Sequence, residues 1–235
     1  MITYNSPPNC QVVGLDNIYR GLFRSQGYFV DVGALDGLNY SNTLALANAG
    51  WQGLWIEPVK RFYNFCQDRI NKDSLNITAL NFAVGNVLGK GIIYTGEHAV
   101  STLNREFKKM LEKEVSYTGQ EECDIVTLDW IFETIVPKNI LVDVLSIDVE
   151  GYELEVLNGF SILRWNPKMI IIEAHEFFIG ENRPVLYPEI NKYFSENHYI
   201  KIYSDEINNI YINPNCFLRG GGVEENANYL YRWEF

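Results

Sequence analysis

The segment from Tyr28 to Gly37 constrains the fold of this chain more than any other. It reads Y-F-V-D-V-G-A-L-D-G, so a short apolar run ends at Asp31 and glycines follow at Gly33 and Gly37. A buried strand, a glycine turn and the start of a helix together form a cradle for a nucleotide-like cofactor. The segment therefore predicts a cofactor-binding α/β fold.

Strand-like and helix-like segments alternate along most of the chain. The predicted strands lie at 28–32, 53–56, 77–82, 123–127, 142–147 and 169–172, and the predicted helices at 12–23, 41–48, 59–71, 104–114, 129–135, 152–158 and 189–196. This order predicts a parallel sheet covered by helices on both faces. Two final strands, at 199–203 and 209–212, are joined too tightly for a crossover and should be antiparallel. Ser41 and Asp129 are the expected caps of their helices.

The length of 235 residues suits one domain with a sizeable core. We expect a single domain over 1–235, with an N-terminal helical extension at 1–27, a lid-like insertion at 95–122 and a C-terminal tail at 220–235. The insertion is long for a simple connection, and such segments tend to be lids or binding loops. The tail alternates aromatic residues, which predicts an edge strand or a strand that faces a partner in a homodimer.

Composition argues against several classes of partner. Lys and Arg total 19 against 30 Asp and Glu, and the resulting net charge of −11 repels phosphate backbones and anionic lipid. The four cysteines show no C-x-x-C spacing, so they predict reduced thiols and no zinc site. The chain begins without a signal-peptide pattern and has no membrane-spanning apolar run. We therefore expect a cytoplasmic protein that binds neither nucleic acid nor a membrane.

Acidic residues recur where the predicted strands end. Glu57, Asp148 and Glu173 each close a strand, and Asp31 and Asp36 flank the glycine loop. In an open parallel sheet, ligands bind beyond the carboxyl ends of the strands. The sequence therefore predicts a site rich in carboxylates at that edge of the sheet.

The loop differs from the dinucleotide fingerprint G-x-G-x-x-G, because one glycine is missing and Asp36 stands where a pyrophosphate would lie. An acid there repels phosphate and favours an ammonium or sulfonium group. S-adenosylmethionine (SAM) carries both groups and no phosphate. Glu57 follows about 20 residues beyond the loop, the spacing of an acid that holds ribose hydroxyls.

Six short motifs occur in order: D-V-G-A-L-D-G, I-E-P, N-F-A-V-G, T-L-D, I-D-V-E-G-Y-E and I-I-E-A-H. In them the chain resembles the FkbM family of SAM-dependent methyltransferases, from Tyr28 to His175 and more weakly through the final hairpin. The resemblance implies a Rossmann-like, seven-stranded, mostly parallel sheet. It also implies O-methylation of a hydroxyl on a small-molecule acceptor such as a natural product, or on a sugar or glycan.

The resemblance also implies a set of cofactor-binding residues. Asp148 would lie near the methionine moiety and the acceptor, and Glu57 would hold the ribose. The predicted cofactor-binding residues are Asp31, Gly33, Ala34, Asp36, Gly37, Glu57, Phe82, Ala83, Val84 and Asp148. Two positions depart from the family pattern, since Ser146 replaces a common Lys and Tyr152 replaces a common Ala. The first removes a cation near the site, and the second places a phenol near the acceptor mouth or against the helix.

Removal of the acceptor proton calls for a general base. The candidates are His175, Asp148, Glu150, Glu173 and, from the insertion, His98. We assign the catalytic role to His175 and Asp148. The carboxylates also suit a divalent cation, but acids are favoured in the first turn of a helix without one, so no metal is predicted.

Two other functions are compatible with the same patterns. A methyltransferase fold can persist as a non-catalytic SAM-binding or assembly module, because fold does not determine function. A nicotinamide-dependent oxidoreductase would use a similar sheet, although the acidity of the loop disfavours it. Parallel titration with SAM and NAD separates these alternatives.

Overall fold

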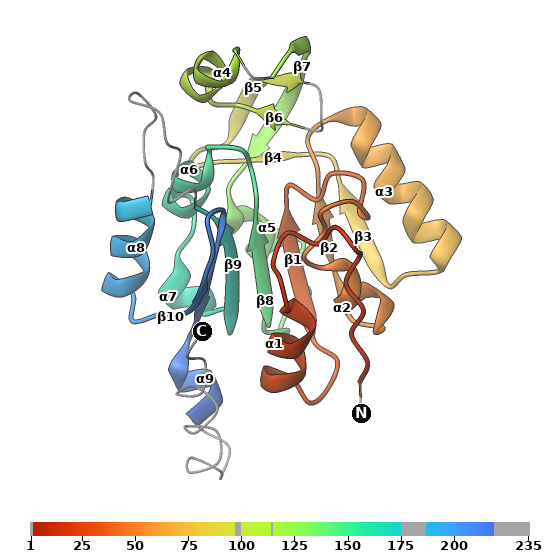
Figure 1. Ribbon diagram of the computed structural model, residues 1–235, viewed down its shortest axis with the longest axis vertical. Coiled ribbons are helices and arrows are strands. Elements are labelled where there is room, and N and C mark those ends of the chain that lie inside the picture. The colour runs from red at the N-terminus through yellow and green to blue at the C-terminus, as the bar shows by residue number, and fades with distance from the viewer. Residues whose placement is uncertain (1, 97–99, 114, 175–186, 219–235) are drawn as a thin grey trace.

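The fold places two β-sheets one above the other, with the larger one flanked by helices (Figure 1). The computed structural model describes residues 2–96, 100–113, 115–174 and 187–218. Within these ranges the large sheet has seven strands and the small sheet has four. The small sheet stands over the carboxyl edge of the large one.

The large sheet has the strand order β10-β11-β9-β8-β1-β2-β3. Its strands are β1 (Tyr28–Val32), β2 (Gln52–Ile56), β3 (Ile77–Leu80), β8 (Val144–Ile147), β9 (Met169–Glu173), β10 (Ile200–Ser204) and β11 (Asn208–Ile212). The pairings from β3 through β9 are parallel, whereas β11 is antiparallel to both β9 and β10. This arrangement confirms the predicted Rossmann-like α/β fold with an antiparallel final hairpin.

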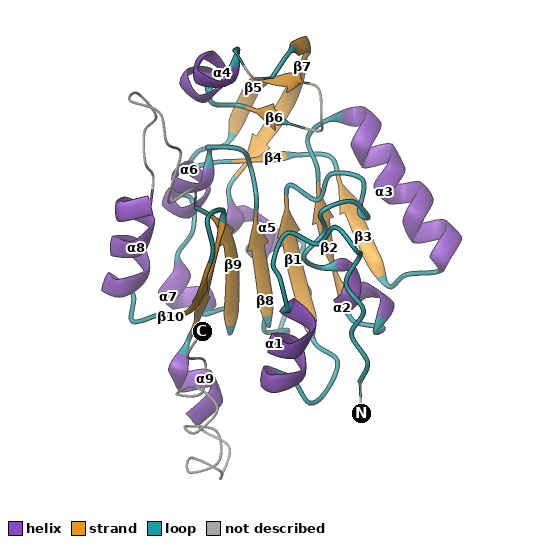
Figure 2. Ribbon diagram, viewed as in Figure 1, coloured by secondary structure: helices purple, strands orange, loops and turns teal. Residues whose placement is uncertain are grey.

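Apolar residues on both faces of the large sheet explain its two helical layers. Val30 and Phe29 of β1, for example, are fully buried in two different core clusters. One cluster includes residues of α5 (Leu128–Thr134), α6 (Glu153–Asn158), α7 (Ile162–Trp165) and α8 (Tyr187–Glu196). The other includes residues of α1 (Leu15–Leu22), α2 (Leu44–Asn48) and α3 (Lys60–Asp73). Figure 2 shows these helices on the two sides of the strands.

The small sheet is the main difference from the sequence-based expectation. It has the order β4-β7-β5-β6, formed by β4 (Ala83–Val84), β5 (Gly89–Gly96), β6 (Ser101–Thr102) and β7 (Tyr117–Val126), and α4 (Arg105–Leu111) follows β6. We expected only a helix and a short strand here. A small core of Val59, Phe62, Ala83, Ile93 and Cys123 joins this sheet to α3. Whether the insertion at 95–122 acts as a lid stays a prediction.

Smaller differences have local causes. The strand expected at 77–82 ends at Leu80, because Ala83–Val84 pair with β7 instead. The helix α5 is capped by Thr127, whose hydroxyl accepts the N–H of Trp130 at 3.1 Å. Asp129 is therefore not the cap we expected, and its carboxylate accepts the N–H of Ser161 at 2.7 Å.

The helix expected to begin at Ser41 begins at Leu44, and its N-cap residue is Thr43 instead of Ser41. The hydroxyl of Ser41 accepts the N–H of Leu44, the first residue of α2, at 3.0 Å. Two short helices, α7 and α9 (Pro214–Leu218), had no counterpart in the sequence analysis. In the part of the chain that the structure describes, no helix is both long and apolar enough to cross a membrane. The four cysteines all lie within the described ranges, and none forms a disulfide.

Candidate functional site

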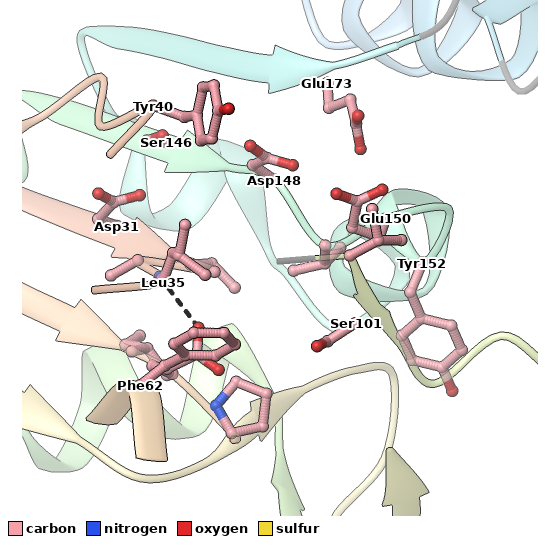
Figure 3. Close-up of a pocket in the computed structure, with 18 of the residues that line it drawn as sticks. Asp31, Leu35, Tyr40, Phe62, Ser101, Ser146, Asp148, Glu150, Tyr152 and Glu173 are labelled. Atoms are coloured by element: carbon pink, nitrogen blue, oxygen red, sulfur yellow. Dashed lines mark hydrogen bonds between the residues drawn. The ribbon is translucent and has the colours of Figure 1, made fainter. Parts of the chain in front are cut away.

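A cavity of about 440 Å³ opens at the carboxyl edge of the large sheet, beneath the small sheet (Figure 3). Its walls come from the loops after β1, β2 and β8, from the end of β9, and from β4, β5 and α4. This is the edge at which parallel α/β sheets bind ligands. Among the described residues that line the cavity there is no Lys, Arg or His, whereas five are Asp or Glu.

Gly33 sets the shape of the loop after β1. Its φ is +88°, and an added Cβ atom would lie 1.7 Å from the backbone oxygen of Asp148. The N–H groups of Gly33 and Ala34 both donate to the carbonyl of Ile56, at 2.9 and 3.1 Å. Because only glycine permits this approach, the loop after β1 lies directly against the end of β8.

Asp31 is buried at the end of β1, where it has few polar partners. Its carboxylate accepts a hydrogen bond from the hydroxyl of Thr43 at 2.6 Å, and Thr43 in turn accepts one from the indole of Trp55 at 3.0 Å. Burial raises the pKa of Asp31 from 3.8 to about 7, despite hydrogen bonds from Thr43 and Ser146 that favour the ionised form. Asp31 is thus poised between its two protonation states near neutral pH.

Glu57 follows β2 and joins two loops. One carboxylate oxygen accepts the N–H of Leu35 at 3.0 Å, the bond drawn in Figure 3, and the other accepts the N–H of Val59 at 2.8 Å. Burial raises the pKa of Glu57 to about 8, although both backbone bonds oppose the rise. The carboxylate is therefore fixed in place and faces the cavity at the start of α3.

Three further acids converge on the other side of the cavity. Carboxylate oxygens of Asp148, Glu150 and Glu173 lie within 4.8 Å of one another, and Figure 3 shows the three side chains facing a common point. Burial raises the pKa of all three, and repulsion between them adds to the rise for Glu150 and Glu173. Carboxylates this close can share protons or hold a divalent cation. We assign no metal to them.

Glu153 supports the loop that carries these acids. Its buried carboxylate accepts the N–H of Val149 at 3.1 Å and that of Gly151 at 3.2 Å. From the small sheet, the Thr102 hydroxyl donates to the carbonyl of Glu150 at 2.8 Å. The side-chain amide of Asn104, which also caps α4, donates to the carbonyl of Gly151 at 2.8 Å. The small sheet is thereby attached to the acidic end of the cavity.

Most of the predicted cofactor residues are brought together. Eight of the ten line the cavity: Asp31, Gly33, Ala34, Glu57, Phe82, Ala83, Val84 and Asp148. The phenol of Tyr152 and the hydroxyl of Ser101 lie on the Glu150 side, away from Asp31 (Figure 3). His175 and His98, two of the candidate bases, lie outside the described residues. The individual roles of all these residues stay predictions.

Asp36 and Gly37 do not line the cavity. The carboxylate of Asp36 accepts the N–H groups of Leu38 at 2.9 Å and Asn39 at 2.7 Å, so it shapes its own turn. Gly37 has a φ of +68° and packs against the ring of Trp55. The sequence argument against phosphate relied on Asp36, but the acidity of the cavity comes from other carboxylates.

The sequence analysis missed Gln11. Its side-chain amide lines the cavity and donates to a carboxylate oxygen of Asp148 at 2.7 Å. No motif surrounds Gln11, and only the folded structure brings the two residues together. The sequence analysis also missed the apolar side chains of Leu103 and Phe107, which line the cavity from the region of α4.

Comparison with known proteins agrees with this geometry. Residues 31–201 match the family described as the methyltransferase FkbM domain. No curated protein matches the chain. A methyltransferase FkbM from Methylobacillus flagellatus KT has 16% sequence identity and a TM-score of 0.53, over 89% of this chain and 48% of that protein. The present chain thus spans about half the length of that protein.

A protein from Staphylococcus aureus assigned as a caffeoyl-CoA O-methyltransferase has 12% identity and a TM-score of 0.52, over 88% of this chain and 85% of that protein. At such identities these two structures establish the fold alone. The family match covers most of the chain and includes all the strand ends that carry the acids of the cavity. The chain belongs to the FkbM methyltransferase domain family.

Proposed function

We propose that this protein is a SAM-dependent O-methyltransferase that acts on a hydroxyl of a small-molecule or glycan acceptor. Membership of the FkbM family supports methyl transfer from SAM. The observation that carries the proposal further is the fixed carboxylate of Glu57, which faces a cavity without a basic side chain among its described residues. Such a cavity suits a ribose and a cationic group, and it opposes a diphosphate.

The residues present fit SAM part by part. Glu57 would accept hydrogen bonds from the ribose hydroxyls, and Phe82, Ala83 and Val84 would flank the adenine. Gly33 and Ala34 line the cavity where the methionine moiety would lie, and Asp148 would provide a carboxylate for its ammonium group. When bound, SAM supplies an electrophilic methyl group on a cationic sulfur.

The acceptor would enter on the side of Glu150, Ser101 and Tyr152. Holding its hydroxyl in line with the methyl group and the sulfur can supply about 7–11 kcal/mol in favourable systems. The hydroxyl must also lose its proton during the attack. Asp148, whose pKa is raised by burial, is the first candidate for this task. His175 follows the end of β9 in the sequence and is the second candidate.

Calorimetric titration tests the cofactor assignment. Wild-type protein should bind SAM, and Glu57→Ala should weaken binding by about tenfold or more, which corresponds to about 1.4 kcal/mol. Glu122→Ala is a matched control, because Glu122 is an exposed acid on β7 outside the cavity. An unchanged affinity in Glu57→Ala would remove the ribose assignment.

Two outcomes would replace the proposed activity. Binding of SAM without transfer to any of a broad set of hydroxylated acceptors would indicate a non-catalytic module. Tighter binding of NAD than of SAM in parallel titrations would indicate an oxidoreductase. The described residues that line the cavity include no Lys, Arg or His to pair with the diphosphate of NAD, so we expect SAM to bind more tightly than NAD.

A further inference from the structure

Gln11 belongs to a segment that precedes the matched domain, yet its side chain lies in the cavity. We propose that Gln11 is a positioning residue of the methyl-transfer site, which holds the carboxylate of Asp148 in its working orientation. The proposal rests on the function proposed above, because Asp148 is the acid assigned there to the SAM ammonium group and the acceptor.

Both polar atoms of the Gln11 side chain are used. The amide nitrogen donates to Asp148 at 2.7 Å, and the amide oxygen accepts from the side chain of Asn42 at 3.1 Å. With this pair of partners, only one orientation of the amide satisfies both bonds. Gln11 therefore connects the loop after β1 to the end of β8, the two segments that would enclose the methionine moiety.

The backbone around Gln11 is anchored independently of the cavity. Val12 is 2% exposed and Tyr4 is 1% exposed, and both pack in the core cluster on the α1 face. The thiol of Cys10 donates to Asn42 at 3.5 Å, and the hydroxyl of Tyr19 donates to the backbone carbonyl of Asn42 at 2.7 Å. Gln11 thus reaches the cavity from a rigid base, as a positioning residue must.

The surroundings of Asp148 explain why this amide matters. Among the described residues, the titratable groups that interact electrostatically with Asp148 are acids: Asp31, Glu57, Glu150, Glu153 and Glu173. Because the neighbouring acids disfavour a negative charge on Asp148, a neutral N–H donor is the group that stabilises its ionised carboxylate. The bond from Gln11 lowers the pKa of Asp148 against the larger opposing effect of burial.

The test compares two substitutions with a matched control. Gln11→Met keeps the length of the side chain and removes the donor, whereas Gln11→Ala removes both. Gln26→Ala is the control, because Gln26 is an exposed residue whose amide donates to the carbonyl of Ala49 at 2.7 Å, outside the cavity. Thermal unfolding of all variants measures any general loss of structure.

Carbon-13 NMR of the Asp148 side chain in ligand-free protein, assigned with Asp148→Asn, gives the first readout. Both Gln11 variants should move the titration midpoint of Asp148 upward by about half a pH unit or more, and Gln26→Ala should not. An unmoved midpoint in Gln11→Met overturns the proposal. Because this measurement needs no cofactor, it tests the effect of Gln11 on Asp148 separately from the binding of SAM.

Calorimetry gives the second readout. Both Gln11 variants should bind SAM about tenfold more weakly than wild type near neutral pH. As the solution is acidified, the affinity of the variants for SAM should also begin to fall at a higher pH than that of wild type. Equal affinities and pH profiles in wild type and Gln11→Met overturn the proposal while leaving the cofactor assignment intact. Failure of wild type to bind SAM overturns the proposed function instead.

Discussion

Substitution of Asp31 by Asn should stabilise the ligand-free protein, and increasingly so as the pH rises. Asp31 is buried, and its pKa is raised from 3.8 to about 7 because burial penalises the charged form. Asn has nearly the same shape. Its oxygen can accept from Thr43 and its amide group can donate to the hydroxyl of Ser146, so the polar neighbours keep their partners.

The size of the effect follows from the two pKa values. A difference of about 3 pH units corresponds to about 4 kcal/mol, at 1.36 kcal/mol per unit. Because the pKa of Asp31 is higher in the folded state, the folded protein holds the proton that the unfolded chain releases. The contribution of protonated Asp31 to the stability of the wild type is therefore fully present below about pH 4, and it is lost as the pH rises through about 7.

Urea unfolding followed by tryptophan fluorescence measures the difference. Between about pH 5 and about pH 9, the free energy of unfolding of Asp31→Asn should rise relative to wild type by about 3 kcal/mol. Asp68→Asn controls for the loss of one negative charge, because Asp68 is an exposed residue of α3. A difference between variant and wild type that stays constant with pH, or that shrinks as the pH rises, would refute the reasoning.

Two further predictions concern the loop and the base. Gly33→Ala should destabilise the protein by roughly 3 kcal/mol and abolish SAM binding, because its Cβ atom would overlap the backbone oxygen of Asp148. Gly14→Ala, with a φ of +74° but open space around it, should cost only about 1 kcal/mol in the same unfolding assay, and equal losses would contradict the argument. His175→Ala should slow the conversion of SAM without changing its affinity, and the exposed His198 supplies the control; an unaffected rate would place the base elsewhere.

The large sheet could be predicted because its strands are short apolar runs with clear ends. The strand expected at 28–32 coincides with β1, in which every residue is buried. The tight connection between 203 and 209 identified the antiparallel hairpin of β10 and β11. Burial on both faces leaves an unbroken apolar signal that a sequence shows directly.

The small sheet could not be predicted in the same way. Half of the residues of β7 are exposed, and its centre contains the consecutive acids Glu121 and Glu122. β5 begins G-K-G and has Ile93 as a buried residue in its middle. Strands that pair over a solvent-exposed face lack the apolar alternation that marks a strand, and glycine is depleted in strands in general.

The candidate site could be predicted as far as topology determines it. Glu57, Asp148 and Glu173 lie together because parallel strands end at one edge of the sheet. Side-chain direction is a different matter, as Asp36 shows. Its carboxylate bonds to the N–H groups of the next residues, a local turn interaction that Asp commonly makes. Gln11 lies beyond such reasoning, because it meets a partner 137 residues away.

The buried acids at the edge of the large sheet have opposite consequences for stability and for binding. Each carboxylate that ionises in this cavity costs folding free energy, as the raised pKa values of Asp31, Glu57 and Glu173 show. Neutral residues of the same shape would avoid that cost, so packing alone does not account for the acids. A cationic ligand offsets it, because the charge of the ligand favours the ionised form of each acid nearby. The groups that destabilise the ligand-free protein are thus the groups that would bind a sulfonium and an ammonium, and SAM should raise the unfolding temperature most where these acids are ionised.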